Sequence, residues 1–476
     1  MAANTEIFQM LPHVVIGVGI IVSILIEIFS KKSEQILPWF SIVIYLFAGA
    51  YSIINVYDNQ VLFGGMFAVG GIAAIFNFIF TIGASIMVLN AVDYIKKHGV
   101  YFGEFYILVQ SSVLGMMLMA GARDLFMVFL GLELMSICFY VLAGLNRKKP
   151  SNNEAALKYF LLGAFATGFI VFGTALIYGT AKTTSIDQII FAFEYLATDI
   201  LFIVGFTLFL IGFLFKIAAF PFHMWVPDVY QGAATPITGL MSTTGKAAAF
   251  SVLIVILSAI FTQNITNNFE TLFAVVATLS MLYGSIVAIA QDNLKRMLAY
   301  SSISHAGYMA IGLAAGNLDS VAGIVFYLTA YAFMNLGAFG VIAMVEGEND
   351  SQTSIDSYAG LSGKSPILAG FMALFMFALA GIPPMAGFFG KYYVFIAAIK
   401  ADLVWLAIVG VVSSVISVYF YLRVVVYMFF KDSSTEFLVR SNFTGTLAVV
   451  ISGLLVLVFG ILPDTPLNII ATVLSY

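Results

Sequence analysis

Long apolar segments separated by short polar ones make up most of the sequence. A run of about 18 to 25 apolar residues is long enough to cross a bilayer as an α-helix, and runs of this kind predict about fourteen membrane helices. Their expected ranges are 10–30, 36–57, 70–92, 103–121, 123–145, 155–179, 198–220, 235–261, 269–290, 298–315, 319–345, 365–400, 403–429 and 445–470. Because the connections are short, we expect a single all-α polytopic membrane domain over residues 1–476 with no soluble module.

The composition agrees with a membrane location. Hydrophobic residues make up 62% of the chain and charged residues 9%, whereas about 25% of the residues of a typical soluble domain are charged. The single cysteine, Cys138, excludes a disulfide framework, a thiolate zinc site and an iron–sulfur cluster within this chain. We therefore expect no cofactor and no metal site here, and nothing in the composition predicts a nucleic-acid partner.

Basic residues outside the apolar runs are distributed unevenly between alternate loops. One set of loops carries Lys31, Lys32, Lys96, Lys97, Arg147, Lys148, Lys149, Lys295, Arg296, Lys364, Arg423, Lys431 and Arg440. The other set carries only Arg123, Lys182 and Lys400. Because cytoplasmic loops are enriched in lysine and arginine, we expect the first set in the cytoplasm and both termini on the outer, periplasmic side. Lys295 and Arg296 are interpreted as anchors at that interface, not as sites.

Five charged residues within the predicted helices are candidates for a functional role. They are Glu133, Lys158, Lys216, Lys246 and Lys391. A lysine at the centre of a bilayer costs roughly 2.5 to 3.5 kcal/mol on insertion scales, so these positions are candidates for ion transfer. For Lys158 an ordinary surface pair with Glu154, four residues earlier, is an equally good interpretation. Buried charges that only fix helix packing remain an alternative for the others.

Two of the predicted helices are interrupted by proline close to an embedded lysine. The first interruption is "FKIAAFPFHMW" and the second is "ALAGIPPMAGFFGKYYVF". Broken membrane helices are tolerated where their freed backbone groups line a polar cavity, and an odd offset between the two gives them opposite orientations, as in an inverted repeat. We therefore expect helices 1–3 in 1–102, a first half-channel repeat (helices 4–8) in 103–261, a second (helices 9–13) in 262–429, and a final helix in 430–476.

Two of the four histidines lie close to these features. His223 follows the first interruption directly, and His305 lies in "LAYSSISHAGYMAIG"; both are expected near the cytoplasmic side of their helices. Histidine changes its charge near physiological pH, so either side chain can pass protons. A histidine that only satisfies hydrogen bonds is an equally good interpretation of each.

Several stretches resemble the antiporter-like membrane subunits of respiratory complex I. They are "GLELMSICFYVLAG", "EAALKYFLLGAFATG", "FKIAAFPFHMWVPDVYQGAATP", "DNLKRMLAYSSISHAGY" and "GIPPMAGFFGKYYVF". This family also includes subunits of multisubunit sodium/proton antiporters and membrane-bound hydrogenases. A lysine in the second broken helix and the segment "SNNEAALKYFLLGAF" are most similar to the N-type branch of the family.

The resemblance implies a role for each candidate residue. Glu133 would pair with Lys216, Lys246 would be the central relay, and Lys391 would be the terminal proton donor toward the outer side. Lys158, His223 and His305 match family positions that line the hydrated route.

The resemblance also implies an activity, partners and a location. The chain would be a proton-translocating subunit of a bacterial inner-membrane NADH:quinone oxidoreductase. NADH, FMN, iron–sulfur clusters and quinone would be bound by partner subunits, and the chain would contact other antiporter-like subunits, small hydrophobic subunits and the lipid bilayer. A subunit of a cation (Na⁺)/proton antiporter and a purely structural membrane subunit remain the alternatives.

Overall fold

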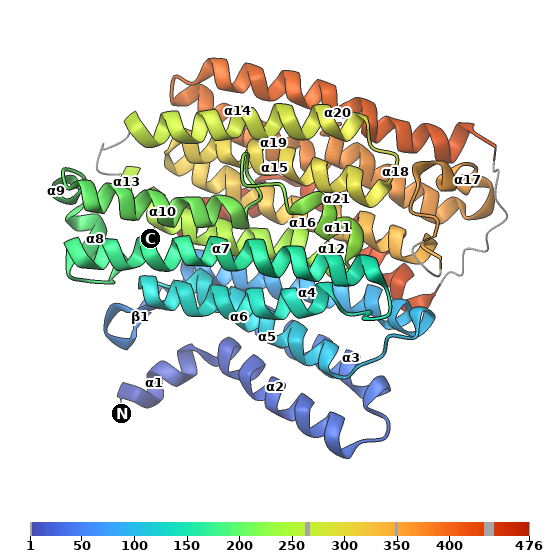
Figure 1. Ribbon diagram of the computed structural model, residues 1–476, viewed down its shortest axis with the longest axis horizontal. Helices are drawn as coiled ribbons and strands as arrows, with labels where there is room; N and C mark the ends of the chain where they lie inside the picture. The colour runs from blue at the N-terminus through green and yellow to red at the C-terminus, as the bar shows by residue number, and fades with distance from the viewer. Residues whose placement is uncertain (1, 262–266, 348–350, 433–441, 476) are drawn as a thin grey trace.

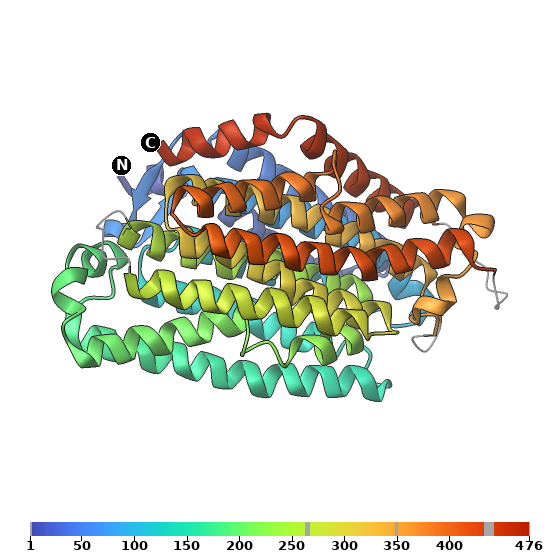
Figure 2. The ribbon, with the colours of Figure 1, turned by 90° about the horizontal axis from the view of Figure 1, so that it is seen from above.

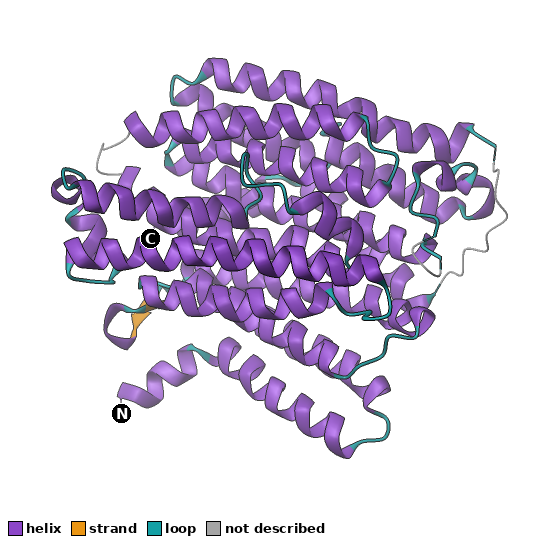
Figure 3. Ribbon diagram, viewed as in Figure 1, coloured by secondary structure: helices purple, strands orange, loops and turns teal. Residues whose placement is uncertain are grey.

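The computed structural model describes residues 2–261, 267–347, 351–432 and 442–475. In this part of the chain most residues are helical, and two short strands form one antiparallel hairpin, as Figure 3 shows. Figures 1 and 2 show that the long helices run roughly parallel to the longest axis of the molecule. This arrangement matches the predicted all-α polytopic fold.

The helices and strands have the following bounds. The N-terminal part comprises α1 (Ala2–Gln9), α2 (Leu11–Phe29), α3 (Ser33–Ile54), β1 (Gln60–Leu62), β2 (Phe67–Val69) and α4 (Gly71–His98). The next part comprises α5 (Glu104–Gly121), α6 (Leu125–Ala143), α7 (Pro150–Ala181), α8 (Ile186–Phe191), α9 (Phe193–Leu196), α10 (Ile200–Lys216), α11 (Val226–Gly232), α12 (Thr235–Leu240), a π-helical turn (Met241–Gly245) and α13 (Lys246–Phe261). The last part comprises α14 (Asn267–Ile289), α15 (Leu294–Ala315), α16 (Leu318–Val345), α17 (Leu361–Lys364), α18 (Pro366–Ala380), α19 (Ala386–Lys400), α20 (Val404–Phe430), α21 (Phe443–Ile461) and α22 (Asp464–Ser475). Single 3₁₀ turns lie at Phe63–Gly65 and Ile355–Tyr358.

Eleven of the described helices are long and apolar enough to cross a membrane. The apolar helices α10 and α18 are shorter because each ends at a break, and α15 is more polar because it carries a run of serines and His305. The count of fourteen crossings therefore stays a prediction. The predicted final helix over 445–470 is wrong in one respect: α21 ends at Ile461, and Pro463 separates it from α22.

The centre of the bundle is formed by α16 and by the continuous rod of α12, the π-helical turn and α13. The apolar windows of Leu318–Val345 and Thr235–Leu257 are 100% buried, whereas those of α2 and α7 are only 28% buried. A helix that is apolar on all sides is favoured in the interior of a membrane protein or a large core. One candidate lysine, Lys246, belongs to this central rod.

The two ends of the bundle differ in charge. Figures 1 and 2 show both termini at the same end, together with the β1–β2 hairpin, α8 and α9. The loops that follow α4, α6 and α20 lie at the opposite end, which carries the basic set of residues apart from Arg440, a residue outside the described ranges. The alternation of loops agrees with the predicted arrangement, while the side that faces the cytoplasm stays a prediction.

Candidate functional site

The first break lies between α10 and α11. Helix α10 ends at Lys216, and Ala218 then adopts a left-handed backbone conformation with φ of 62°, which is uncommon for a residue with a Cβ. Two backbone groups at the break find partners outside the helix: Phe220 N donates to Ser280 Oγ at 2.9 Å, and Phe215 O accepts from Trp225 Nε1 at 3.1 Å. Although the helix is interrupted here, both of these backbone groups therefore have hydrogen-bond partners within the protein.

Lys216 is held by hydroxyl groups of α6. Its side chain is 5% exposed, and Nζ donates to Ser136 Oγ at 2.9 Å and to Tyr140 OH at 3.2 Å. The carboxylate of Glu133, one turn before Ser136, accepts instead from Thr167 Oγ1 of α7 at 2.8 Å. Within the described residues, Glu133 and Lys216 form no ion pair, so the predicted direct contact between them is not made in this structure. Glu133 remains close enough to act on Lys216 electrostatically.

Lys246 follows the π-helical turn and points at α15. It is 1% exposed, and Nζ donates to the backbone O of Ser302 at 2.7 Å and to Ser302 Oγ at 2.5 Å. A π-turn inside a helix rotates the residues that follow it and is frequent at functional sites. Just before Lys246 in the chain, Ser242 Oγ accepts from Asn335 Nδ2 of α16 at 2.8 Å. A fully buried lysine thus has a polar environment on two neighbouring helices.

One face of α15 connects Lys246 with Lys391. Ser302, His305 and Tyr308 follow one another at intervals of three residues, so each is a neighbour of the next along the helix surface. The nitrogens of His305 lie 2.8 Å from Tyr327 OH (Nδ1) and 3.0 Å from Tyr421 OH (Nε2). The prediction that His305 lies near the cytoplasmic side is wrong: the residue is at the middle of α15 and is buried.

Lys391 lies beyond the second break and reaches back across it. Helix α18 ends at Ala380, Gly381 has φ of 85°, and α19 begins at Ala386. Lys391 is 4% exposed, and its Nζ donates to the carbonyls of Leu379 at 3.3 Å and Ala380 at 2.9 Å. These are carbonyls that the end of α18 leaves without helical partners, and the negative end of the helix dipole also favours a cation there.

Two further groups complete the surroundings of Lys391. Ser414 Oγ of α20 accepts from Nζ at 2.8 Å, and the ring centroid of Tyr308 lies 4.8 Å from Nζ. Tyr308 OH donates to Ser413 Oγ at 3.2 Å, and a hydrogen bond of 2.9 Å joins Ser413 Oγ to Ser285 Oγ. Tyr308 therefore links Lys391 to a buried cluster of serine hydroxyls on α14, α15 and α20.

Lys158 takes part in an ion-pair network at the basic end of the bundle. Its Nζ lies 2.5 Å from Glu154 and 2.7 Å from Asp228 of α11, and Asp228 also pairs with Arg296 of α15 at 2.7 Å. A polar cavity of about 320 Å³ lies beside this network and is lined by Glu154, Asp228 and Gln231 among others. The surface pair with Glu154 is present, and it belongs to a larger cluster that joins both predicted repeats.

His223 and Lys295 also have environments that differ from expectation. His223 is buried inside the first break, where its ring stacks on Phe220 and lies 4.5 Å from the ring of Tyr283. Lys295, interpreted from the sequence as an interfacial anchor, is buried and donates from Nζ to the carbonyl of Ala233 at 2.8 Å. That interpretation is wrong, because Lys295 points into the protein between α11 and α12.

Residues 122–417 match the model of a protein family described as "NADH:quinone oxidoreductase/Mrp antiporter, TM". The chain is 44% identical over 459 residues to NADH-quinone oxidoreductase subunit N of Trichlorobacter lovleyi, covering 95% of this chain and 94% of that one. It is also 44% identical over 451 residues to NADH-quinone oxidoreductase subunit N 1 of Chloroherpeton thalassium, covering 94% of both. The chain belongs to this antiporter family. The expected family membership is thereby confirmed.

Solved structures of antiporter-family complexes share the fold over nearly the whole chain. A chain of respiratory complex I from Thermus thermophilus superimposes with a TM-score of 0.83 at 31% identity, covering 97% of this chain and 99% of that one. A chain of the Mrp complex from Dietzia sp. superimposes with a TM-score of 0.87 at 19% identity, covering 98% and 97%, and this second likeness concerns the fold alone. All the candidate charges from Glu133 to Lys391 lie inside the range matched by the family model.

Several polar neighbours in this antiporter-family chain were not singled out from the sequence. The hydroxyls that hold the lysines are those of Ser136, Tyr140, Ser302 and Ser414. Ser136 and Tyr140 follow Glu133 at i+3 and i+7, and Ser302 precedes His305 by three residues, so helical spacing from a charged residue is a signal that could have found them. Ser414 carries no such signal because it meets Lys391 only through tertiary packing.

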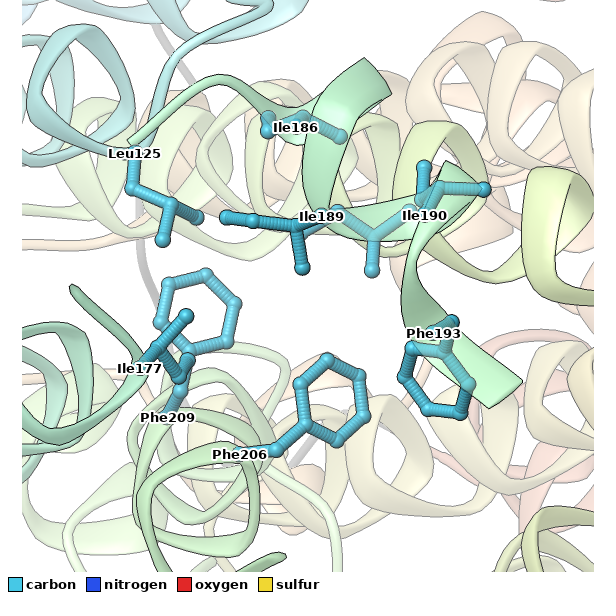
Figure 4. Close-up of a pocket in the computed structure, with 9 residues that line it drawn as sticks. Leu125, Ile177, Ile186, Ile189, Ile190, Phe193, Phe206 and Phe209 are labelled. Atoms are coloured by element: carbon cyan, nitrogen blue, oxygen red, sulfur yellow. The ribbon is translucent and has the colours of Figure 1, made fainter. Parts of the chain in front are cut away.

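Apolar side chains gather at the end of the bundle with α8 and α9. Figure 4 shows isoleucines from α7 and α8 and phenylalanines from α9 and α10 pointing toward one small space. Its volume is about 10 Å³ and its lining, which includes Leu125, Ile189 and Phe206, is entirely apolar. An entirely apolar lining offers a water no hydrogen-bond partners, so this space disfavours a bound water.

Proposed function

We propose that this chain is the N-type, proton-translocating membrane subunit of a bacterial NADH:quinone oxidoreductase. The full-length relatives at 44% identity carry that name. The observation that carries the activity is the face of α15 that joins two buried lysines: Ser302 binds Lys246, and Tyr308 lies beneath Lys391. Polar side chains placed between two buried titratable groups are a means of moving protons, and a scaffold does not need them.

In this proposal the proton passes from Lys216 to Lys246 and on to Lys391. Each lysine hands on its proton and becomes neutral, then takes up the next one, so the route returns to its starting state after each transfer. The Glu133 carboxylate, bound here to Thr167, would control Lys216 by approaching it and withdrawing. Moving one charge against 100 mV takes about 2.3 kcal/mol. A change in the distance between a half-buried carboxylate and a buried lysine is large enough in energy to supply this amount.

The electron-transfer chemistry would belong to partner subunits. NADH, FMN, iron–sulfur clusters and quinone would bind there, and this chain would contact other antiporter-like and small hydrophobic subunits within the membrane. Among the described residues no cluster of histidine, cysteine and carboxylate side chains is arranged to hold a metal ion. The two inverted repeats and a periplasmic location of both termini are parts of the same proposal.

The test is to compare Lys216→Ala with Lys400→Ala in the whole purified complex, reconstituted into liposomes. Lys400 is 59% exposed and pairs with Asp319 at the end of the bundle opposite to the basic loops. We expect Lys216→Ala to lower both proton pumping and coupled NADH:quinone turnover, and Lys400→Ala to leave both near the wild-type values. Full pumping by assembled Lys216→Ala complex would contradict the role of Lys216.

The alternative of a cation/proton antiporter has its own test. The family model includes Mrp antiporters, so sodium-dependent proton movement without any electron donor would favour that function. If the complex purified through a tag on this chain had no NADH:quinone reductase activity, the antiporter function would be favoured further. A structural role alone would instead give Lys216→Ala complex that assembles poorly but pumps normally once assembled.

A further inference from the structure

A completely buried carboxylate lies at the basic end of the central helix. Glu346 follows directly after α16 and its relative exposure is 0%. Its carboxylate accepts a short hydrogen bond from Thr235 Oγ1 at the start of α12 and a longer one, at 3.5 Å, from Tyr94 OH of α4. Lys97 Nζ donates to its backbone oxygen. Glu346 is thus the meeting point of three helices, and the route from Lys216 to Lys391 does not use it.

A polar cavity at the basic end shares two lining side chains with the surroundings of Glu346. Its volume is about 420 Å³, and it lies between α4, α16 and the start of α21. Asn90, Asp93, Tyr94 and Lys97 are among its lining residues, and Tyr94 and Lys97 are the same side chains that contact Glu346. A polar space of this size holds several waters, since one water occupies about 30 Å³ of the liquid.

On its other side, Glu346 faces the helix that leads to Lys246. Thr235, Thr238 and Ser242 follow one another at i, i+3 and i+7, so they occupy one face of α12 and the start of the π-helical turn. The distance from Thr235 to Ser242 along this helix is about 10 Å. At its inner end, Asn335 Nδ2 donates to Ser242 Oγ at 2.8 Å and to Tyr331 OH at 3.1 Å.

The last part of this path ends at Lys246. Tyr331 interacts with Ser302, and Ser302 binds Lys246 Nζ through both its hydroxyl and its carbonyl. Polar groups therefore run from the cavity through Glu346, along α12 and across α16 to the central lysine. The ion-pair network of Lys158, Asp228 and Arg296 lies on α7, α11 and α15, so it is a separate feature of the same end.

We propose that Glu346 is the proton-loading group of an access path that leads from the basic side of the membrane to Lys246. This inference rests on the proposed function and adds an uptake route that bypasses Lys216. A hydronium ion in the cavity protonates the carboxylate of Glu346 and leaves as water. The protonated acid then passes this proton inward through hydroxyl groups and intervening water to the neutral amine of Lys246, and Glu346 becomes a carboxylate again.

A structural role for Glu346 makes different demands on its side chain. A residue that only joins α4, α12 and α16 needs the correct length and hydrogen-bonding atoms, which glutamine supplies. A proton-loading residue needs a titratable carboxyl group, which aspartate supplies in a shorter form. The pair Glu346→Gln and Glu346→Asp therefore separates the two roles.

The experiment measures proton pumping per NADH oxidised by whole complexes reconstituted into liposomes, with assembly checked for each variant. We expect Glu346→Gln to assemble and to lose at least half of its pumping, and Glu346→Asp to retain most of it. Wild-type pumping by Glu346→Gln, or an equal loss in both variants, would overturn the proposal.

A cavity-filling variant tests the path without altering Glu346. Gly445 lines the cavity, and a Cβ there comes within 3.3 Å only of the flexible side chain of Met344. We expect Gly445→Leu to assemble and to pump less than wild type; unchanged pumping would count against the path. Lys246→Ala is measured in parallel: if this variant pumps normally, the proposed function itself fails, whereas loss in Lys246→Ala with normal pumping in both Glu346→Gln and Gly445→Leu overturns the uptake path alone.

Discussion

The two broken helices hold their lysines in different ways. Helix α10 begins at the end with α8 and α9 and Lys216 is its last residue, whereas α18 begins at the opposite end and Lys391 lies in the second segment, α19 (Figure 1). Lys216 is bound by two side-chain hydroxyls of α6, and Lys391 by two backbone carbonyls of α18 and one hydroxyl.

This difference indicates different tasks for the two lysines. Backbone carbonyls at a helix end are fixed in position, so the surroundings of Lys391 change only if the break itself moves. Side-chain hydroxyls and the nearby Glu133 carboxylate can rotate, so the surroundings of Lys216 can change within an unchanged backbone. A lysine whose partners can move, such as Lys216, is suited to regulating proton transfer. A lysine whose partners are fixed, such as Lys391, is suited to releasing each proton toward the same side.

The largest effect is expected from Lys391→Arg. Arginine keeps the positive charge near Leu379 O and Ala380 O, so the complex should assemble, but its guanidinium does not release a proton. We expect proton pumping in liposomes to fall by about tenfold or more, which corresponds to about 1.4 kcal/mol or more of activation free energy. Retained pumping would mean that charge alone, and not proton exchange, is what Lys391 provides.

Lys391→Ala is the matched comparison for stability. It leaves the two carbonyls of α18 and the hydroxyl of Ser414 without their shared donor. A buried polar group that loses its partner costs about 1 to 3 kcal/mol. We therefore expect this variant to lower the thermal stability of the purified complex as well as its pumping, while Lys391→Arg lowers pumping alone.

An intermediate effect is expected from removing the hydroxyls that hold Lys216. Hydrogen bonds to charged groups contribute about 1.5 to 3 kcal/mol, and Ser136→Ala and Tyr140→Phe each remove one without changing side-chain size much. We expect each single variant to lower pumping severalfold. The double variant should lose less than the product of the single losses, because the two groups share one partner. Strictly multiplicative losses would contradict a shared site at Lys216.

The positions of these charges along the chain could be predicted from the sequence, whereas the contacts that their side chains make between helices could not. A lysine inside an apolar run and a proline beside it are local features, so Lys216, Lys246 and Lys391 and both breaks were found. The partners depend on how helices pack: Ser414 meets Lys391 from α20, and the π-helical turn turns Lys246 toward Ser302. Neither arrangement leaves a periodic signal in the sequence.

The burial of Lys295 and Glu346 could not be predicted, because the local sequence of each resembles an exposed loop. Lys295 stands beside Arg296 in a basic pair, which is typical of a solvated anchor, yet it is buried. Glu346 begins the acidic stretch "EGEND", which reads as an exposed connection, yet it is fully buried. In both cases burial results from the ends of distant helices, α11–α12 for Lys295 and α4 with α12 for Glu346, which only the folded chain brings together.

The smallest effect is expected from Ser414→Ala. This variant removes one of the three acceptors of Lys391 and leaves both carbonyls of α18 in place, so we expect a loss at the low end of the about 1.5 to 3 kcal/mol that a hydrogen bond to a charged group contributes. Pumping should fall less than it does after the loss of Ser136 or Tyr140. Val415→Ala is a suitable control, because Val415 is the next residue on the same helix and is 67% exposed. Pumping and turnover should be measured for both variants beside Ser136→Ala. If Ser414→Ala is as damaging as Ser136→Ala while Val415→Ala is harmless, the backbone carbonyls are not sufficient to hold Lys391. The distinction between a lysine with fixed partners and one with adjustable partners would then no longer hold.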